Sequence, residues 1–381
     1  MSRFSDILII GGGAIGGSIA LALAERGASV SVFEAGAIGK GASWAAAGVL
    51  APDWSGEDPP ALTRLAADSL LLWPDWVKLV EDRSGIALNF RRDGLINVWV
   101  DPEAPHLPPD LATTPPPCPE GRAQRLSAAE VRELEPKISG PILGGVLYPE
   151  DAQVDNPRLA TALLRAAASL GTRVRSNAPI RELLGAGGKC RGIRLASGET
   201  IEAEAVVVAA GAWSGPLAAS SGLTLPTIPW RGQMVTLDAA ASSRPLSHIV
   251  FCGEMVLIPR PHGPLVVGTT LENVGFDSRV TAAGMHHIFS RLERIAPDLG
   301  GLPVLKTWAG LRPGTPDHLP YLGPVPGWEG LFAATGHGRK GIILAPITGA
   351  LMAEVILEGR IDPRILECLP GRLPPRLRAS Q

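Results

Sequence analysis

The stretch Gly11-Gly12-Gly13-Ala14-Ile15-Gly16 decides the fold of this chain. It follows four apolar residues, Ile7 to Ile10, which predict a buried strand. It opens a small-residue apolar segment, Ala14–Arg26, which predicts a helix that Gly27 ends. A second strand is predicted over Val30–Glu34. A strand, a glycine turn, a helix and a strand in this order form the βαβ unit that binds the pyrophosphate of a dinucleotide.

The fixed positions of this fingerprint have separate physical roles. Gly11 makes the tight turn, Gly13 lets the backbone approach a phosphate, and Gly16 lets the helix pack on the strand. Glu34 lies 23 residues after Gly11, where a carboxylate accepts hydrogen bonds from a ribose hydroxyl and disfavours a 2′-phosphate. A dinucleotide ligand is therefore predicted, and this pattern alone fits both NAD and FAD.

Bulk composition excludes several function classes. The 381 residues carry a formal net charge of −2 with no run of basic residues, which argues against binding to nucleic acid or an anionic membrane. No stretch of about 18 uninterrupted apolar residues predicts a membrane span. The four cysteines lie far apart without a C-x-x-C pair. That spacing predicts neither a metal site nor a disulfide framework, and it favours a reducing, cytoplasmic compartment.

The order of elements predicts an α/β fold with two interleaved domains, because a chain of this length exceeds one hydrophobic core. The continuous apolar run Ala205–Ala209 is typical of a parallel strand buried on both faces. Three more strands, Gly232–Leu237, Met255–Pro259 and Leu265–Thr269, alternate and predict an antiparallel sheet. A Rossmann-like dinucleotide-binding domain is thus expected to interleave with an α+β substrate domain built on an antiparallel sheet.

Domain boundaries follow from these elements. The dinucleotide-binding domain is predicted to comprise residues 1–85, 150–215 and 305–365, and the substrate domain residues 86–149 and 216–304. Residues 366–381, which contain several arginines and prolines, are interpreted as a solvated tail.

Four segments of the chain resemble FAD-dependent glycine oxidases of the thiamine-synthesis type, within the D-amino-acid oxidase family. Gly41–Pro52 resembles the loop after the fingerprint, and Tyr148–Asp155 a segment in the middle of those chains. Trp308–Asp317 is similar to their carboxylate-binding strand and turn, and Gly336–Pro346 to their C-terminal flavin loop. The resemblance extends in consistent order from about residue 6 to residue 358.

The resemblance implies FAD as the cofactor and assigns residues to it and to the substrate. The implied cofactor-binding residues are Gly11, Gly13, Ala14, Ile15, Gly16, Glu34, Ser43, Ala46, Ala47, Val174, Ala210, Gly211, Gly338, Lys340, Gly341 and Ile342. Arg312 and Arg339 are the implied catalytic residues, and Met255 and Val256 line the substrate pocket with Arg312. A planar guanidinium suits a substrate carboxylate because it offers two parallel N–H donors. From the residues alone, an ion pair between Arg312 and Asp317 is the alternative.

Two departures from the family pattern carry expectations. Val256 stands where these oxidases usually have a tyrosine whose hydroxyl helps to hold the substrate carboxylate, so a bulkier, N-substituted or more apolar amine is expected to fit. The related sarcosine-oxidase branch links flavin to a cysteine near the segment Trp308–Arg312, and no cysteine lies near it here. FAD is therefore predicted to bind non-covalently.

The function implied by the resemblance is oxidative deamination of glycine, or of a related small D- or N-substituted amino acid, to the imino or oxo acid. Electrons would pass to O2 and give H2O2. A D-amino-acid dehydrogenase with another electron acceptor is the first alternative, and an NAD-dependent dehydrogenase and a non-catalytic flavin-binding subunit are two others. The resemblance also implies a homo-oligomer.

Overall fold

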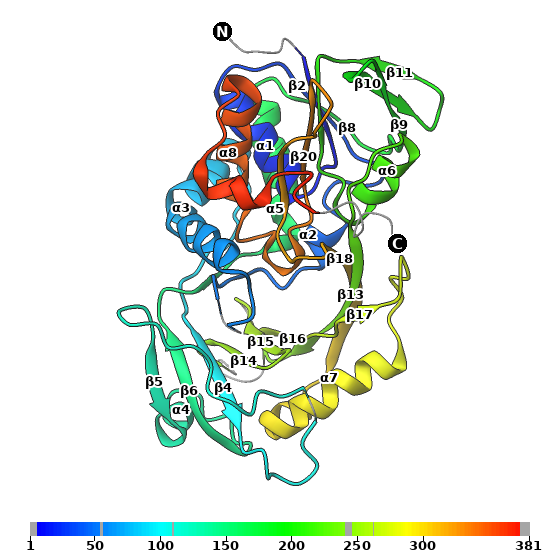
Figure 1. Ribbon diagram of the computed structural model, residues 1–381. Helices are drawn as coiled ribbons and strands as arrows, with labels where there is room; N and C mark the ends of the chain where they lie inside the picture. Colours follow the sequence, from blue (N-terminus) through cyan, green and yellow to red (C-terminus); the bar gives the residue numbers. More distant parts are fainter. Residues whose placement is uncertain (1–5, 54–55, 109, 241–245, 262, 374–381) are drawn as a thin grey trace.

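The computed structural model describes residues 6–53, 56–108, 110–240, 246–261 and 263–373. Within them the chain forms a six-stranded sheet flanked by helices and a nine-stranded sheet, which occupy the upper and lower halves of Figure 1. Two long strands, β13 (Ile228–Asp238) and β18 (Val304–Gly314), reach from one half toward the other.

The six-stranded sheet has the order β19-β20-β12-β1-β2-β8. Its strands are β1 (Ile7–Ile10), β2 (Val30–Phe33), β8 (Arg173–Arg175), β12 (Ala205–Val208), β19 (Tyr321–Pro324) and β20 (Leu331–Thr335). All neighbouring pairs are parallel except β19 with β20. Successive side chains of β1 enter different cores, Ile7 and Ile9 on one face and Leu8 and Ile10 on the other. That double burial explains why the strand is apolar at every position.

Layers of different kinds cover the two faces of this sheet. One face packs against α1 (Ala14–Glu25), α3 (Pro60–Ser84), α5 (Asn156–Ser169) and α8 (Ala345–Glu358). The other carries α6 (Ser214–Ser220) and the small antiparallel sheet of β9 (Ile180–Ala186), β10 (Lys189–Leu195) and β11 (Thr200–Glu202). Helix α3 continues through Pro74 as a single helix.

Eight strands of the nine-stranded sheet follow the order β17-β13-β16-β15-β14-β4-β6-β5. The ninth strand, β18, also pairs with β13. Its remaining strands are β4 (Leu95–Val100), β5 (Gln124–Ser127), β6 (Ile142–Tyr148), β14 (Ile249–Cys252), β15 (Met255–Pro259), β16 (Pro264–Gly268) and β17 (Glu272–Asn273). Neighbours are antiparallel except β4 with β14. Helix α7 (Ala282–Ile295) buries Ile288, Leu292 and Ile295 in the core beneath this sheet.

Shorter elements complete the described chain. They are α2 (Ala42–Ala45), α4 (Ala128–Leu134), β3 (Val49–Leu50), β7 (Ala152–Gln153), η1 (Gly211–Trp213), η2 (Pro297–Leu299), η3 (Gly338–Lys340) and η4 (Pro363–Cys368). No helix in the described ranges combines the length and the hydrophobicity that a membrane crossing requires.

The predicted α/β class with a Rossmann-like part and an antiparallel sheet is confirmed, whereas two details of the predicted boundaries are wrong. Residues 305–314 were assigned to the dinucleotide-binding domain, but they pair along β13 in the large sheet. Arg372 was assigned to a solvated tail, but its guanidinium lies 2.7 and 2.8 Å from the two carboxylate oxygens of Asp317. Residues 374–381 of that tail lie outside the described residues.

Candidate active site

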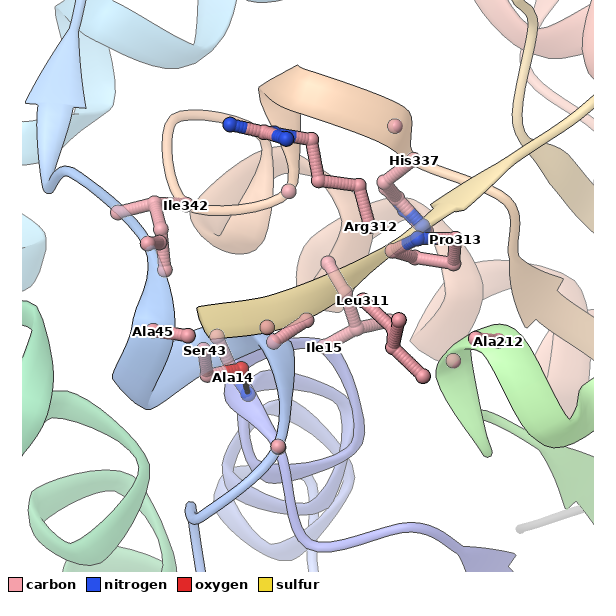
Figure 2. A pocket seen from close by; sticks show the side chains of 18 of the residues that line it. Ala14, Ile15, Ser43, Ala45, Ala212, Leu311, Arg312, Pro313, His337 and Ile342 are labelled. Atoms are coloured by element: carbon pink, nitrogen blue, oxygen red, sulfur yellow. Dashed lines mark hydrogen bonds between the residues drawn. The ribbon is translucent and has the colours of Figure 1, made fainter. Parts of the chain in front are cut away.

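One elongated cavity of about 450 Å³ connects the two halves of the molecule. Its wall includes Glu34 at the end of β2, the N-terminus of α1, and Arg312 on β18. Figure 2 shows Arg312 extending from β18 on the side opposite Ala14 and Ser43. The cavity therefore reaches from the α1 N-terminus to Arg312.

The turn after β1 exposes the N-terminus of α1 to this cavity. Gly11 has a φ of +112°, and a β-carbon there would lie 2.3 Å from the Ala209 carbonyl oxygen, so no other residue fits without displacement. The Gly12 N–H donates to Glu34 Oε2 at 2.8 Å, and the Ala14 N–H donates to Ser43 Oγ at 2.9 Å. The N-cap Gly13 offers no side-chain cap of its own. This end of the cavity thus combines a helix N-terminus, which favours an anionic phosphate, with a carboxylate, which is suited to a ribose hydroxyl.

Two residues fix the loop that crosses the cavity after β2. Asn156 Nδ2 donates to the carbonyl oxygens of Ser43, Trp44 and Ala46 at 2.9, 3.1 and 2.8 Å. Arg260 donates to the carbonyl oxygen of Ala47 at 2.5 Å. Local sequence does not reveal this role of Asn156, because its amide reaches a loop 110 or more residues away along the chain.

At the other end of the cavity, Arg312 is held by neutral oxygens only. Its guanidinium donates to Thr270 O at 3.1 Å and to Thr269 Oγ1 at 2.6 Å. Within the described ranges it forms no ion pair with a carboxylate, because Asp317, the alternative partner, binds Arg372 instead. Burial lowers the pKa of Arg312 to about 10, so the group stays cationic at neutral pH. A positive charge without a counter-ion on the cavity wall is a site for an anionic ligand.

Gly232 on β13 makes room for the Arg312 side chain. A β-carbon at Gly232 would lie 2.1 Å from Arg312 NH1 and 2.4 Å from its Cζ. We expect Gly232→Ala to displace the guanidinium and to raise KM for an amino-acid substrate about 10-fold or more, since about 1.4 kcal/mol of lost binding suffices for that change. Thermal unfolding should change little, because a flexible side chain can move aside. An unchanged KM in this variant would show that substrate binding does not depend on the space that Gly232 leaves for the Arg312 guanidinium.

Sixteen of the predicted site residues line the cavity. They are Gly11, Gly13, Ala14, Ile15, Glu34, Ser43, Ala46, Ala47, Ala210, Gly211, Val256, Arg312, Gly338, Arg339, Gly341 and Ile342. The structure also places Pro179 and Ile180 on the wall near Glu34, and Thr269 and Glu254 toward the other end. The sequence did not single out these four residues as ligand contacts.

Four predicted site residues lie outside the cavity wall. Gly16 sits behind the turn, close to the Gly11 carbonyl oxygen, where it serves packing rather than contact. Val174 pairs with Val32 in the sheet. Ile180 lies in the cavity wall, where Val174 was predicted to lie. Met255 precedes Val256 on the same strand, so its side chain points to the opposite face, into the core.

Lys340 is the fourth of these residues. Its Nζ lies 3.0 Å from Asp58 Oδ2 and donates to Ala51 O at 3.0 Å, so the ammonium is directed into a buried pair rather than toward the cavity. Burial lowers its pKa to about 8. The side chain of Lys340 therefore anchors the C-terminal loop to the segment that follows β3.

His337 lies in the cavity wall but is a poor candidate for a catalytic base. Burial lowers its pKa to about 3, and its Nε2 lies 3.2 Å from Thr348 Oγ1. The imidazole is therefore neutral and engaged. Among the described residues, no group of three or more His, Cys, Asp and Glu side chains could hold a metal ion.

Comparison with known proteins identifies the family. Residues 6–355 match the family described as DAO, FAD dependent oxidoreductase. The chain belongs to this family. It is 37% identical to the bifunctional protein ThiO/ThiG of Nostoc sp. over 94% of its own length, and it spans 53% of that protein. It is 35% identical to the glycine oxidase of Geobacillus kaustophilus, over 93% of this chain and 94% of that one.

Solved structures agree with this assignment. The crystal structure of the Geobacillus kaustophilus glycine oxidase matches with a TM-score of 0.87 and 32% identity, covering 98% of this chain and all of that one. The structure of an iminodiacetate oxidase from Chelativorans sp. matches with a TM-score of 0.83 and 28% identity, over 96% and 98% of the two chains.

The cavity fits FAD, the cofactor of this family. Its nucleotide end combines a carboxylate with a helix N-terminus, and much of its wall between there and Arg312 consists of glycine and alanine, which let backbone approach a flat ligand closely. No described atom lies within 4 Å of where a β-carbon of Gly211 or Gly338 would be, so the space beside both residues is open. The wall therefore leaves room for a long, flat ligand between the α1 N-terminus and Arg312.

Proposed function

We propose that the protein oxidises glycine, or a related small D- or N-substituted amino acid, to the imino and then the oxo acid, with O2 as electron acceptor and H2O2 as product. The observation that carries this proposal is Arg312, a buried cation at the far end of the FAD cavity that has no carboxylate partner among the described residues. The glycine oxidase relatives, matched over nearly their whole length, support the same reaction class.

The residues of the chain supply binding and orientation. Gly11, Gly13 and the C-terminal loop at Gly338 would hold FAD in the cavity, and FAD bound there would supply the hydride-accepting chemistry. The carboxylate of the substrate binds Arg312, whose position is fixed by Thr269 and Thr270, and this anchoring selects which Cα–H faces the cofactor. The amine reacts in its neutral form, so the reaction requires no side chain as a general base. His337 in the cavity wall contacts Thr348 instead. The imine leaves and is hydrolysed in water.

The apolar wall near Arg312 influences which substituents a substrate can carry. Val256 is buried on β15 and lines the cavity together with Met234 and Phe251. This surface offers no hydroxyl to the substrate carboxylate and favours an apolar substituent on nitrogen or on Cα. We therefore extend the proposed substrates beyond glycine to N-alkyl glycines and small D-amino acids.

Non-covalent attachment of FAD is part of the proposal, because none of the four cysteines lines the cavity. Precipitation of the holoenzyme with trichloroacetic acid is expected to release all yellow colour into the supernatant. A yellow pellet would contradict this expectation.

The function is tested by anaerobic reduction of the bound flavin with a panel of glycine, sarcosine and D-amino acids. We expect at least one member to bleach the flavin, and reoxidation in air to yield one H2O2 per substrate oxidised. Bleaching without H2O2 would favour the dehydrogenase alternative, and no bleaching by any member would favour a non-catalytic subunit. The family assignment makes FAD the cofactor and removes the NAD alternative.

Three wider features remain proposals. The ThiO/ThiG relatives support a role in thiamine synthesis. All four cysteines are unpaired, which supports a cytoplasmic location. A homo-oligomer and the division into an FAD-binding and a substrate domain are proposed from the family resemblance.

A further inference from the structure

The end of the cavity near Arg312 carries three charged side chains. Arg312 and Arg339 are the cations, and Glu254 is the carboxylate. Glu254 lies in the two-residue turn between β14 and β15, and its Oε1 is 2.9 Å from Arg339 NH1. Both side chains are only partly exposed, 30% and 23% respectively, so water screens this ion pair incompletely.

Arg312 and Arg339 therefore differ in what they can offer a ligand. Among the described residues, Arg312 donates to neutral oxygens only, whereas Arg339 binds the carboxylate of Glu254 at 2.9 Å and lies 3.8 Å from that of Asp58. The three groups are close enough to influence one another, since Glu254 raises and Arg339 lowers the pKa of Arg312. The Asp58 carboxylate is also paired with Lys340 at 3.0 Å, so these three cations and two carboxylates leave one net positive charge at this end of the cavity.

The backbone holds Glu254 in register with Arg312. The Thr269 N–H donates to Glu254 O at 3.3 Å, and Thr269 Oγ1 accepts from Arg312. The same residue thus fixes the turn that carries the carboxylate and the guanidinium that binds the substrate.

One net positive charge matches one substrate carboxylate. A second carboxylate on the substrate would have to displace Glu254 from Arg339 or lie unpaired against the apolar wall of Met234, Phe251 and Val256. Either outcome leaves a partly buried carboxylate without a partner, which is unfavourable. The fold itself does not impose this limit on the substrate, because an iminodiacetate oxidase has the same fold.

We propose that Glu254 is a specificity-determining residue that occupies Arg339 and restricts the substrate to amino acids with a single carboxylate. This inference rests on the proposed function and defines its substrate class as monocarboxylates with a neutral substituent. Dicarboxylates such as iminodiacetate or D-aspartate are excluded by the charge of the protein rather than by size.

Two unreactive ethers form a matched test pair. Methoxyacetate has the shape of sarcosine, and oxydiacetate adds a second carboxylate to it. Their Kd values for the holoenzyme are measured by the change in flavin absorbance on titration. We expect the wild-type protein to bind methoxyacetate at least about 10-fold more tightly than oxydiacetate, the ratio that about 1.4 kcal/mol produces.

The substitution Glu254→Gln removes the carboxylate 2.9 Å from Arg339, leaves that of Asp58 at 3.8 Å, and should shift the ratio about 10-fold or more toward oxydiacetate. The double substitution Glu254→Gln/Arg339→Gln should abolish the shift, because the Arg339 cation is then absent. Turnover of iminodiacetate relative to sarcosine should change in the same direction. Glu367→Gln is the matched control, since it removes the carboxylate of an exposed Arg–Glu pair with Arg64 and should leave the ratio unchanged.

Equal wild-type affinity for the two ethers would overturn the inference even if Glu254→Gln failed to fold. An unchanged ratio in a folded, flavin-loaded Glu254→Gln protein would overturn it as well. Failure of the proposed function looks different: methoxyacetate would not perturb the flavin, and no monocarboxylate amino acid would reduce it.

Discussion

Replacing Arg312 by alanine is expected to lower kcat/KM for the amino-acid substrate by about 10²–10³-fold, since truncating one partner of a buried charge pair costs about 2–5 kcal/mol. The substrate carboxylate would lose its cationic partner, and Arg339 could not replace it because that side chain binds Glu254 at 2.9 Å. Steady-state assays of H2O2 release measure the effect.

Two further substitutions make this result interpretable. Arg312→Lys keeps the charge but loses the planar pair of donors, so we expect an intermediate kcat/KM. Arg175→Ala, which removes an exposed guanidinium paired with Glu199, should leave kcat/KM unchanged. If Arg312→Ala retained wild-type kcat/KM, the assignment of the substrate end of the cavity would be wrong.

Replacing Gly11 by alanine is expected to abolish FAD binding. The added β-carbon would lie 2.3 Å from the Ala209 carbonyl oxygen, and a φ of +112° strains any residue other than glycine. Relief of this overlap must move the turn or β12, and both support the α1 N-terminus that faces the phosphates. The flavin-to-protein ratio of the purified soluble protein measures the loss.

Gly27→Ala is the matched control for Gly11→Ala. Gly27 also has a positive φ, +79°, but no atom lies within 4 Å of a β-carbon there. We expect both substitutions to lower the free energy of unfolding by about 1–3 kcal/mol through backbone strain. Only Gly11→Ala should lose the flavin. If Gly11→Ala retained a wild-type flavin content, the proposed contact of this turn with the cofactor would be wrong.

Local sequence patterns were most informative where burial and backbone geometry act over a few residues. The apolar run of β1, the glycine turn and Glu34 predicted the βαβ unit, because each depends on neighbours close in sequence. The boundary of the second domain was less accurate, since the strand β18 is defined by its pairing with β13 more than 70 residues earlier.

Within the candidate site, the sequence identified residue types but not side-chain directions. Met255 and Val256 are adjacent, and only the register of β15 decides that Val256 faces the cavity. Lys340 belongs to the predicted flavin loop, yet its side chain turns to Asp58, a partner far away in the chain. Such choices depend on neighbours that the fold brings together.

By itself, the sequence determined a dinucleotide fold at Gly11–Gly16 and, through its resemblance to a family, FAD and an arginine for the substrate. These features are contained in short motifs whose backbone chemistry is local. Only the tertiary structure decided that Asp317 pairs with Arg372, that Arg312 has no carboxylate partner among the described residues, and that Glu254 binds Arg339. Ion pairs form between side chains that are close in space, and the separation along the chain between these partners is 55 and 85 residues. The charge that a substrate meets is therefore a property of the folded chain.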